Sequence, residues 1–189
     1  MMEATLFDLF KYHQGRQIDK WRHYFPIYEK HFAEYRRSNV RVLEIGIDHG
    51  GSLQLWKRYF GRHADIIGVD IRPETLFDEP QIRTYCYDQC DASIAKHGPF
   101  DIVIDDGSHE MAHMQRTFDN LWPVTDGVYL IEDCHWGLPV EAGLWKNEMA
   151  PYFYPDVFVA ERKKRMIRGT PSRELREDEK QARNLYGSL

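Results

Sequence analysis

Five short apolar runs constrain the fold of this chain more than any other feature. They are RVLEIGI (41–47), ADIIGVD (64–70), IRTYCYD (82–88), FDIVIDD (100–106) and GVYLIED (127–133). Runs of this length that are rich in Val and Ile are typical of strands buried on both faces of a sheet. Four of the five end in an acidic residue, so titratable groups gather where the predicted strands stop.

Two of the segments between these runs have helical patterns. SLQLWKRYFG (52–61) follows a glycine turn and itself ends in glycine, a residue typical of helix ends. Ser108 is placed to cap a helix that runs to about Trp122. One side of that helix would carry Met111, Met114, Phe118 and Leu121. Strands that alternate with helices predict an α/β fold, with a mostly parallel sheet covered on both faces.

A third helical pattern precedes the first strand. From Asp19 onward, apolar residues recur at spacings of three and four, as one face of a helix requires. These residues are Trp21, Tyr24, Phe25, Tyr28, Phe32 and Tyr35, and we expect them to pack on a core. At 189 residues the chain fits one domain. We divide it into an N-terminal helical segment (1–39), a core of alternating strands and helices (40–160) and a charged tail (161–189) in which Ser172 could cap a helix.

Composition narrows the range of partners. The net charge is −5 with mixed signs, which argues against a nucleic-acid binder. Three cysteines are too few for a disulfide framework or a paired zinc site, so a cytoplasmic location is the default expectation. No apolar run approaches membrane-spanning length, and MMEATLFDLFKYHQG lacks the pattern of a signal peptide. We therefore expect a small-molecule partner, and neither a nucleic acid nor a membrane.

In parallel sheets of this kind, ligands bind at the carboxyl ends of the strands. The turn EIGIDHGG (44–51) discriminates between two candidate ligands, a dinucleotide and S-adenosylmethionine. A dinucleotide fingerprint needs glycine at the position of Asp48. A carboxylate there would repel a diphosphate, whereas S-adenosylmethionine carries no phosphate and two positive groups. Asp70 could bind ribose hydroxyls of either ligand. Asp88 and Gln89 suit an adenine edge, although a plain turn is about as compatible with the sequence.

Several motifs in combination resemble the class I methyltransferases of the macrolide-sugar type, which are metal-dependent O-methyltransferases. The similarity covers roughly residues 13–136, including the Asp19-Lys20-Trp21 segment. FDIVIDDGSH and VYLIEDC are specific in combination, whereas EIGxxxG alone is a weak signal. The resemblance implies a Rossmann-like, doubly wound, mostly parallel seven-stranded sheet, S-adenosylmethionine as the methyl donor and a bound Mg²⁺. It also implies an N-terminal cap over the cofactor and the substrate.

The resemblance also implies roles for individual residues. It places metal ligands at Asp106, Glu132 and Asp133, and the general base at His109. The residues expected to bind the cofactor are Glu44, Gly46, Gly50, Gly51, Ser52, Asp70, Asp88, Gln89 and Asp105. Since adjacent residues on a strand point in opposite directions, only one acid of the pair Asp105-Asp106 can be the principal metal ligand. The choice of Asp106 comes from the resemblance, and Asp105 keeps no firm role.

The chemistry of these residue types agrees with the resemblance. Carboxylates from two neighbouring strand ends form an oxygen-rich site that suits Mg²⁺ rather than Zn²⁺. A histidine, with an ordinary pKa of about 6.5, could take the proton of an acceptor hydroxyl near neutral pH. Taken alone, His109 would more often be a surface residue at a helix N-terminus. His113 and His135 could each lie behind such a site or be merely exposed.

We therefore expect an O-methyltransferase that acts on a hydroxyl of a sugar or a glycosylated small molecule. Two alternatives stay open. One is an adenosine-binding partner subunit without catalysis, and the other is an NAD-dependent oxidoreductase, which Asp48 disfavours. After residue 136 the chain is shorter than the resemblance predicts. Part of the substrate wall would then be missing, shortened or supplied by another subunit, and we expect a homo-oligomer.

Overall fold

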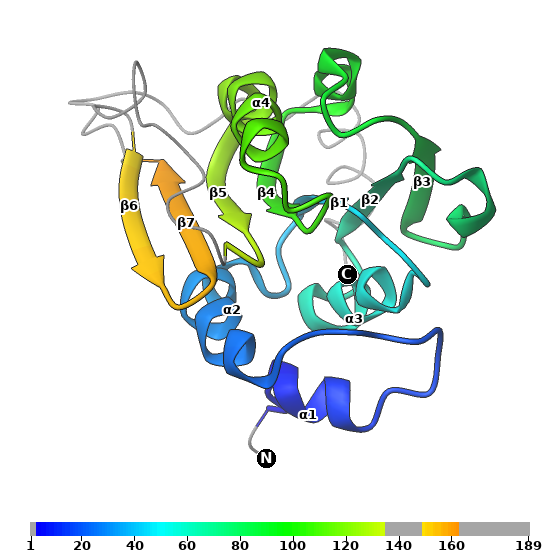
Figure 1. The fold of residues 1–189 in the computed structure, drawn as a ribbon. Coiled ribbons are helices and arrows are strands. Elements are labelled where there is room, and N and C mark those ends of the chain that lie inside the picture. Colours follow the sequence, from blue (N-terminus) through cyan, green and yellow to red (C-terminus); the bar gives the residue numbers. More distant parts are fainter. Residues whose placement is uncertain (1–2, 135–148, 163–189) are drawn as a thin grey trace, which may run out of the picture.

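The computed structural model describes residues 3–134 and 149–162, which build a seven-stranded sheet between helices (Figure 1). The strand order is β3-β2-β1-β4-β5-β7-β6. The strands are β1 (Arg41–Ile45), β2 (Asp65–Asp70), β3 (Ile82–Cys86), β4 (Phe100–Asp105), β5 (Thr125–Ile131), β6 (Met149–Tyr154) and β7 (Val157–Arg162). β1 to β5 are parallel, and β7 runs antiparallel to both β5 and β6. The predicted mostly parallel, seven-stranded fold is confirmed.

The helices lie on both faces of this sheet. α1 (Leu6–Lys11), α2 (Phe25–Phe32) and α3 (Gly51–Phe60) cover one face, and α4 (Met111–Leu121) covers the other (Figure 1). Each face has its own apolar core, and both cores are built from alternate residues of the same strands. On β1, for example, Val42 points to the α2 and α3 side while Leu43 points to the α4 side. The near-continuous apolar runs of the sequence follow from this burial on both faces.

Two helix boundaries differ from the prediction. The helix expected from Asp19 begins only as a 3₁₀ turn at Arg22–Tyr24 followed by α2, and Trp21 stays 59% exposed. Pro26, in the first turn of α2, has no N–H to donate to an upstream carbonyl, so the helix cannot extend backwards unbroken.

The cap predicted for α4 was also wrong. The helix starts at Met111, two residues later than a cap at Ser108 predicts, without a side-chain cap. His109 has a φ of 60°, which is incompatible with a right-handed helix, so Ser108 lies outside it. Met111 is 48% exposed, whereas the other three apolar residues of that face are buried as expected.

α1 was not predicted, although the sequence carries its signal. Thr5 accepts a hydrogen bond from the Asp8 backbone N–H, and the Asp8 carboxylate accepts from the Thr5 N–H, which is a capping box. α1 packs on α2 and α3. The charged helix predicted after Ser172 lies outside the described residues.

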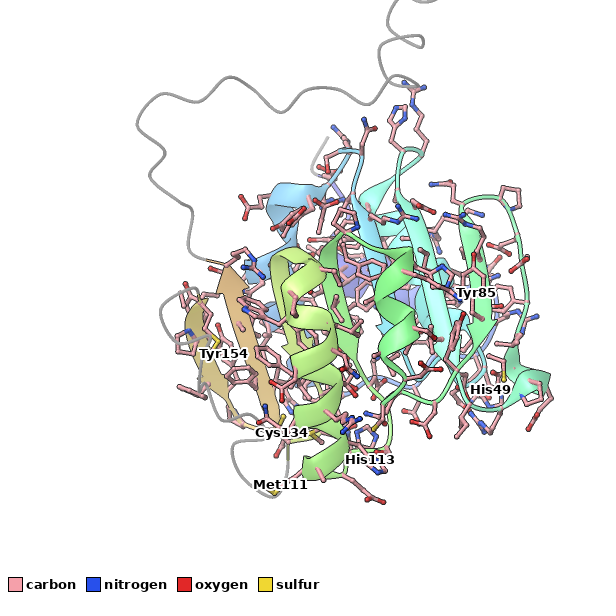
Figure 2. All side chains as sticks on the ribbon, turned by 90° about the horizontal axis from the view of Figure 1, so that it is seen from above. His49, Tyr85, Met111, His113, Cys134 and Tyr154 are labelled. Atoms are coloured by element: carbon pink, nitrogen blue, oxygen red, sulfur yellow. The ribbon has the colours of Figure 1, made fainter. Side chains whose placement is uncertain are left out.

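The order of the strands reverses between β1 and β4, because β2 and β3 extend the sheet one way and β5 the other. Loops that leave neighbouring carboxyl ends in opposite directions open a crevice at this point. Figure 2 shows Met111 and His113 at the start of α4 and Cys134 after β5, all at the same end of the molecule. Among the described residues, no helix has the length and apolar character needed to cross a membrane.

Candidate active site

A cavity of about 550 Å³ opens at the carboxyl ends of the parallel strands. Its walls come from the loops after β1 to β5 and from the segment before α2. The lining residues are Asp19, Lys20, Trp21, Ile45, Gly46, Asp48, Val69, Asp70, Ile71, Arg72, Tyr87, Asp88, Gln89, Asp106, Gly107, Ser108, His109, His113, Glu132 and Asp133. A volume of this size is typical of a small-molecule site.

The structure divides the residues that the sequence proposed for the site. Eight of them line the cavity: Gly46, Asp70, Asp88, Gln89, Asp106, His109, Glu132 and Asp133. The other five, Glu44, Gly50, Gly51, Ser52 and Asp105, lie behind its walls or on the opposite face of the sheet. The acids after β4 and β5 therefore meet at one end of the cavity, and the loops after β2 and β3 form the other.

The glycine turn after β1 shapes the floor of the cavity. Gly46 has a φ of 80°, and a Cβ built there would lie 2.0 Å from the backbone oxygen of Asp106. Gly50, with a φ of 82°, caps α3 in the left-handed region. A Cβ on Gly51 would meet the backbone oxygens of Gln17 and Arg16. Glycine is thus required for backbone conformation at two positions and for close packing of the N-terminal segment at the third.

Replacing Gly46 with alanine is expected to lower the free energy of unfolding. Left-handed strain alone costs about 1–3 kcal/mol, and the loss should be larger because the backbone at Asp106, just after β4, must also move. The matched control is Gly107→Ala, whose Cβ would lie nearest to the side-chain amide of Gln89 and not to a backbone atom. Urea unfolding of both variants measures the difference. An equal loss at the two positions would show that the contact between Gly46 and Asp106 is not critical.

Asp70 holds this turn in place rather than standing free in the cavity. One carboxylate oxygen accepts hydrogen bonds from the backbone N–H groups of Ile47 and Asp48 at 3.1 and 3.2 Å, and the other accepts from the Arg72 N–H at 2.9 Å. The Arg72 guanidinium donates to the Asp48 carboxylate at 3.0 Å and lowers the pKa of that group. Asp48 is therefore charge-compensated, and its charge alone does not exclude a diphosphate.

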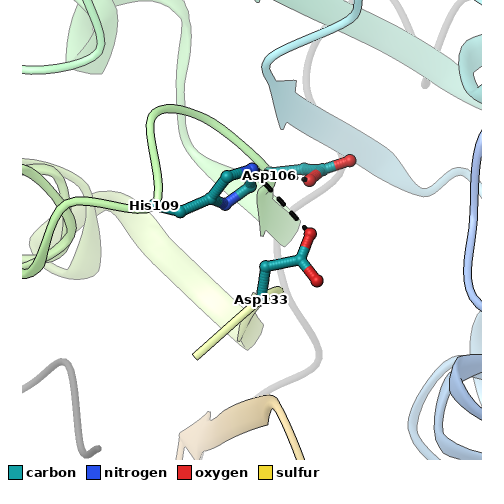
Figure 3. Close-up of side chains that lie close together, drawn as sticks. All are labelled: Asp106, His109 and Asp133. Atoms are coloured by element: carbon teal, nitrogen blue, oxygen red, sulfur yellow. Dashed lines mark ion pairs between the residues drawn. The ribbon is translucent and has the colours of Figure 1, made fainter. Parts of the chain in front are cut away.

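Three side chains converge where β4 and β5 end (Figure 3). His109 Nε2 lies 3.9 Å from Asp106 Oδ1 and 3.8 Å from Asp133 Oδ2. One ligand atom from each residue can be chosen so that all lie within 4.8 Å of one another, a spacing compatible with a single bound cation. His109 and Asp133 both have positive φ, at 60° and 55°. Non-glycine residues in this region are strained, and such strain concentrates at functional sites.

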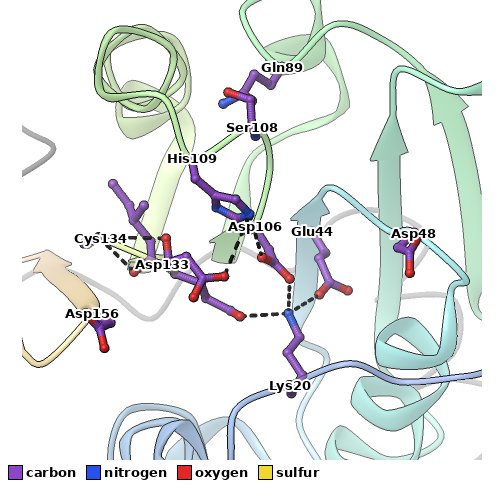
Figure 4. A network of polar contacts seen from close by, with 12 residues as sticks. Lys20, Glu44, Asp48, Gln89, Asp106, Ser108, His109, Asp133, Cys134 and Asp156 are labelled. Carbon is purple, nitrogen blue, oxygen red and sulfur yellow. Dashed lines mark hydrogen bonds and ion pairs between the residues drawn. The ribbon is translucent and has the colours of Figure 1, made fainter. Parts of the chain in front are cut away.

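Lys20 is the central residue that the sequence reasoning missed (Figure 4). Its ammonium donates to Asp106 Oδ2 at 2.6 Å and to both Glu132 oxygens at 2.9 and 3.0 Å. It also lies 3.1 Å from Glu44 Oε1. The only signal in the sequence was its place in the Asp19-Lys20-Trp21 segment. Nothing in the local pattern shows that a lysine 86 residues upstream of Asp106 reaches that carboxylate.

The aromatic residues before and within α2 also contact the acids. Tyr28 donates to Glu132 Oε1 at 2.8 Å, and Tyr24 donates to Asp133 Oδ1 at 2.7 Å. Tyr24 Oη also accepts from the Asp133 backbone N–H at 3.2 Å. These side chains are buried as the helical pattern predicted, but each places a phenol at the site.

Burial and crowding shift the pKa values of this cluster. Burial raises the pKa of Asp106, and the Lys20 ammonium opposes that shift. Burial and the Asp106 carboxylate raise the pKa of Glu132, again against Lys20. Burial disfavours the charged Lys20, yet the three carboxylates together hold its pKa well above the ordinary value. Lys20 thus offsets only part of the cost of burying these acids, and their hard oxygen donors suit a divalent cation such as Mg²⁺.

Asp105 points away from these groups. Its side chain is buried on the α4 side of the sheet, where Tyr129 donates to Asp105 Oδ2 at 3.3 Å. Burial raises the pKa of Asp105 to about 7. Alternation along β4 thus sends one acid of the pair to each face of the sheet.

Comparison with known proteins places these features in context. No family model matches the chain. A tetracenomycin-C 3'-O-methyltransferase from Streptomyces olivaceus is 46% identical over 132 residues, which are 61% of this chain and 34% of that protein. The mycinamicin VI 2''-O-methyltransferase from Micromonospora griseorubida is 46% identical over 126 residues, 59% of this chain and 31% of its own length. The chain thus spans about a third of the length of these curated relatives.

Solved structures of the methyltransferase MycE, from the mycinamycin biosynthetic pathway, agree with this similarity. The complex of MycE with Mg and SAH superposes with a TM-score of 0.66 at 33% identity, covering 82% of this chain and 53% of MycE. The complex that also holds mycinamycin VI gives a TM-score of 0.66 at 30% identity, covering 89% of this chain and 56% of MycE. This chain has the class I methyltransferase fold, and the resemblance to the macrolide-sugar O-methyltransferases that its motifs indicated is confirmed.

Proposed function

We propose that this chain is an S-adenosylmethionine- and Mg²⁺-dependent O-methyltransferase that acts on a hydroxyl of a sugar or a glycosylated small molecule. The observation that carries the proposal is the convergence of Asp106, Asp133 and His109 in a cavity at the point where the strand order reverses. The curated relatives are named as sugar O-methyltransferases, and MycE was solved with Mg and SAH. Because the chain spans only part of those proteins, we offer their chemistry for it as a proposal.

Different residues of the cavity would contact the methionine, ribose and adenine parts of the methyl donor. Gly46 lines the cavity beside the strand ends, where the methionine portion would lie. Asp70 could accept a hydrogen bond from a ribose hydroxyl through Oδ1 in place of its long 3.4 Å contact with Arg72 Nε, and Asp88 and Gln89 stand where the adenine edge would lie. In this proposal Glu44, Gly50, Gly51 and Ser52 support the site from behind. Ser52, for instance, donates to the buried Glu44 carboxylate at 2.7 Å.

The acids and His109 provide the chemistry of transfer. Asp106 and Asp133 would hold the cation, whose charge would lower the pKa of a nearby acceptor hydroxyl. Glu132, also expected as a ligand, turns inward to Lys20 and Tyr28 and would support the site from behind. His109 faces Asp106 and Asp133 from the cavity side, so its imidazole can take the hydroxyl proton. The acceptor oxygen then attacks the donor methyl group, which leaves S-adenosylhomocysteine.

Two experiments separate this function from its rivals. Calorimetry with S-adenosylhomocysteine, NAD and Mg²⁺ measures which ligands bind, and an assay with a panel of glycosylated acceptors measures formation of S-adenosylhomocysteine. We expect binding of S-adenosylhomocysteine and Mg²⁺, and methyl transfer that stops with a chelator. Binding of NAD alone would overturn the proposal. Binding of the nucleoside without transfer to any acceptor would favour a non-catalytic partner subunit.

Trp21 is the candidate platform for the acceptor. It lines the cavity next to Lys20, yet 59% of its surface is exposed, unlike the buried aromatic residues that follow it. An indole face packs well on the apolar side of a sugar ring, a contact worth on the order of 1 kcal/mol. Trp21→Ala is therefore expected to raise the acceptor KM by roughly five- to tenfold.

The affinity of Trp21→Ala for S-adenosylhomocysteine should stay unchanged, as calorimetry can check. Phe153→Ala is the matched control, because Phe153 is 58% exposed on β6 and does not line the cavity. A KM that rises equally in both variants, or in neither, would remove Trp21 from acceptor binding.

A further inference from the structure

A buried ammonium lies at the centre of the acid cluster. Lys20 Nζ is within 3.1 Å of oxygens from Glu44, Asp106 and Glu132, and its side chain is 2% exposed (Figure 4). The lysine reaches this place from the segment before α2, which crosses α3 where the Gly51 N–H donates to the Gln17 oxygen. The ion pairs therefore connect the N-terminal wall of the cavity to the ends of β1, β4 and β5.

The three carboxylates differ in what else holds them. Ser52 and Trp56 donate to Glu44 Oε2 at 2.7 and 3.1 Å, and Tyr28 donates to Glu132 Oε1. Glu44 and Glu132 are thus fixed within the protein interior. Asp106 instead turns Oδ2 to Lys20 and Oδ1 towards His109 in the cavity. It bridges an inner position, filled by the ammonium, and an outer position beside Asp133.

Three carboxylates share the ammonium of Lys20. Among the described residues, Glu44, Asp106 and Glu132 all approach this one charge, and Glu44 and Glu132 are almost fully buried. Crowded buried carboxylates are stable only when cations or donors compensate them. A second positive charge fits the outer position, where Asp106 and Asp133 approach His109.

We propose that Lys20 is a positioning residue that acts as the inner of two cations sharing this acid cluster. The inference rests on the proposed function, in which a divalent cation takes the outer position. Two cations that share carboxylates repel each other, so the ammonium weakens binding of the ion. It also keeps the ion out of the inner position between Glu44 and Glu132. The ion is thereby confined to the outer position, which faces the cavity.

The test is a titration of Mg²⁺ into the full chain by calorimetry. Lys20→Met, which keeps the length of the side chain and removes its charge, is expected to bind Mg²⁺ at least about tenfold more tightly than the wild type. Its methyl-transfer rate should fall, because the ion is no longer confined to the outer position. Lys20→Arg keeps the charge, so its Mg²⁺ affinity is expected to stay closer to the wild-type value than that of Lys20→Met. A lysine that only supported the fold would instead give weaker metal binding together with lower activity.

Unchanged or weaker Mg²⁺ binding by Lys20→Met would overturn the proposal. If that variant does not fold, Glu44→Gln and the pair Lys20→Met/Glu44→Gln provide the same comparison, because the pair removes one charge of each sign. The pair should bind Mg²⁺ more tightly than Glu44→Gln alone, and equal or weaker binding overturns the proposal. A wild type that binds no Mg²⁺ would overturn the metal dependence of the proposed function and the role of Lys20 with it. Wild-type binding without tightening in the variants would overturn only the role of Lys20.

Discussion

His109→Asn is expected to lower the turnover number by roughly two to four orders of magnitude, the usual loss when a general base is removed. Of the three groups that converge after β4 and β5, the imidazole is the proposed proton acceptor, since Asp106 and Asp133 would hold the cation. Asparagine is the better replacement because His109 has a φ of 60°, and asparagine adopts this region more readily than alanine. A change in rate then reports the lost base and not a refolded loop.

The measurement is the initial rate of S-adenosylhomocysteine formation, with calorimetry to show that the nucleoside and Mg²⁺ still bind. His113→Asn is the matched control. His113 also lines the cavity, but its ring contacts Ser108 Oγ at 2.9 Å and lies near Glu110 rather than the acids at the strand ends. We expect its rate to change by no more than about threefold, the scale of a peripheral contact. An unchanged rate for His109→Asn would remove His109 from the mechanism.

The sheet could be predicted from the sequence because its signal is local. Each run of Val, Ile and Leu carries its own evidence of burial, and the predicted strands match β1 to β5 within two residues at each end. The position of the cavity followed from the same signal, because parallel strands bring their carboxyl ends to one edge. The acids of FDIVIDD and GVYLIED therefore came together as their spacing indicated.

The missed features depend on contacts between distant segments. Lys20 meets Glu132 across 112 residues, and Tyr28 meets it across 104. A helical pattern shows that Tyr28 is buried, but not that its hydroxyl finds a carboxylate. The later start of α4 has a similar origin, since the left-handed backbone of His109 reflects the shape of the loop and no residue type in the motif demands it.

Asp106→Asn is expected to abolish the dependence of activity on Mg²⁺ and to weaken Mg²⁺ binding by at least about 100-fold, since even partners behind metal ligands contribute 10–100-fold. The amide keeps the shape of the side chain and an oxygen for Lys20, but it removes the charge that Asp106 offers to the outer position. Calorimetry measures the affinity, and a Mg²⁺ titration of the transfer rate measures the dependence.

The neighbouring acid provides the control that makes this result specific. Asp105→Asn changes the same side chain one residue earlier on β4, but Asp105 contacts Tyr129 on the α4 side of the sheet. Its Mg²⁺ affinity should stay within about threefold of the wild-type value, since the group is not directed at the cation. If Asp105→Asn lost Mg²⁺ binding while Asp106→Asn kept it, the acid after β4 would be assigned to the wrong face. The pair DD in FDIVIDD thus places two carboxylates in different surroundings, because side chains alternate along a strand.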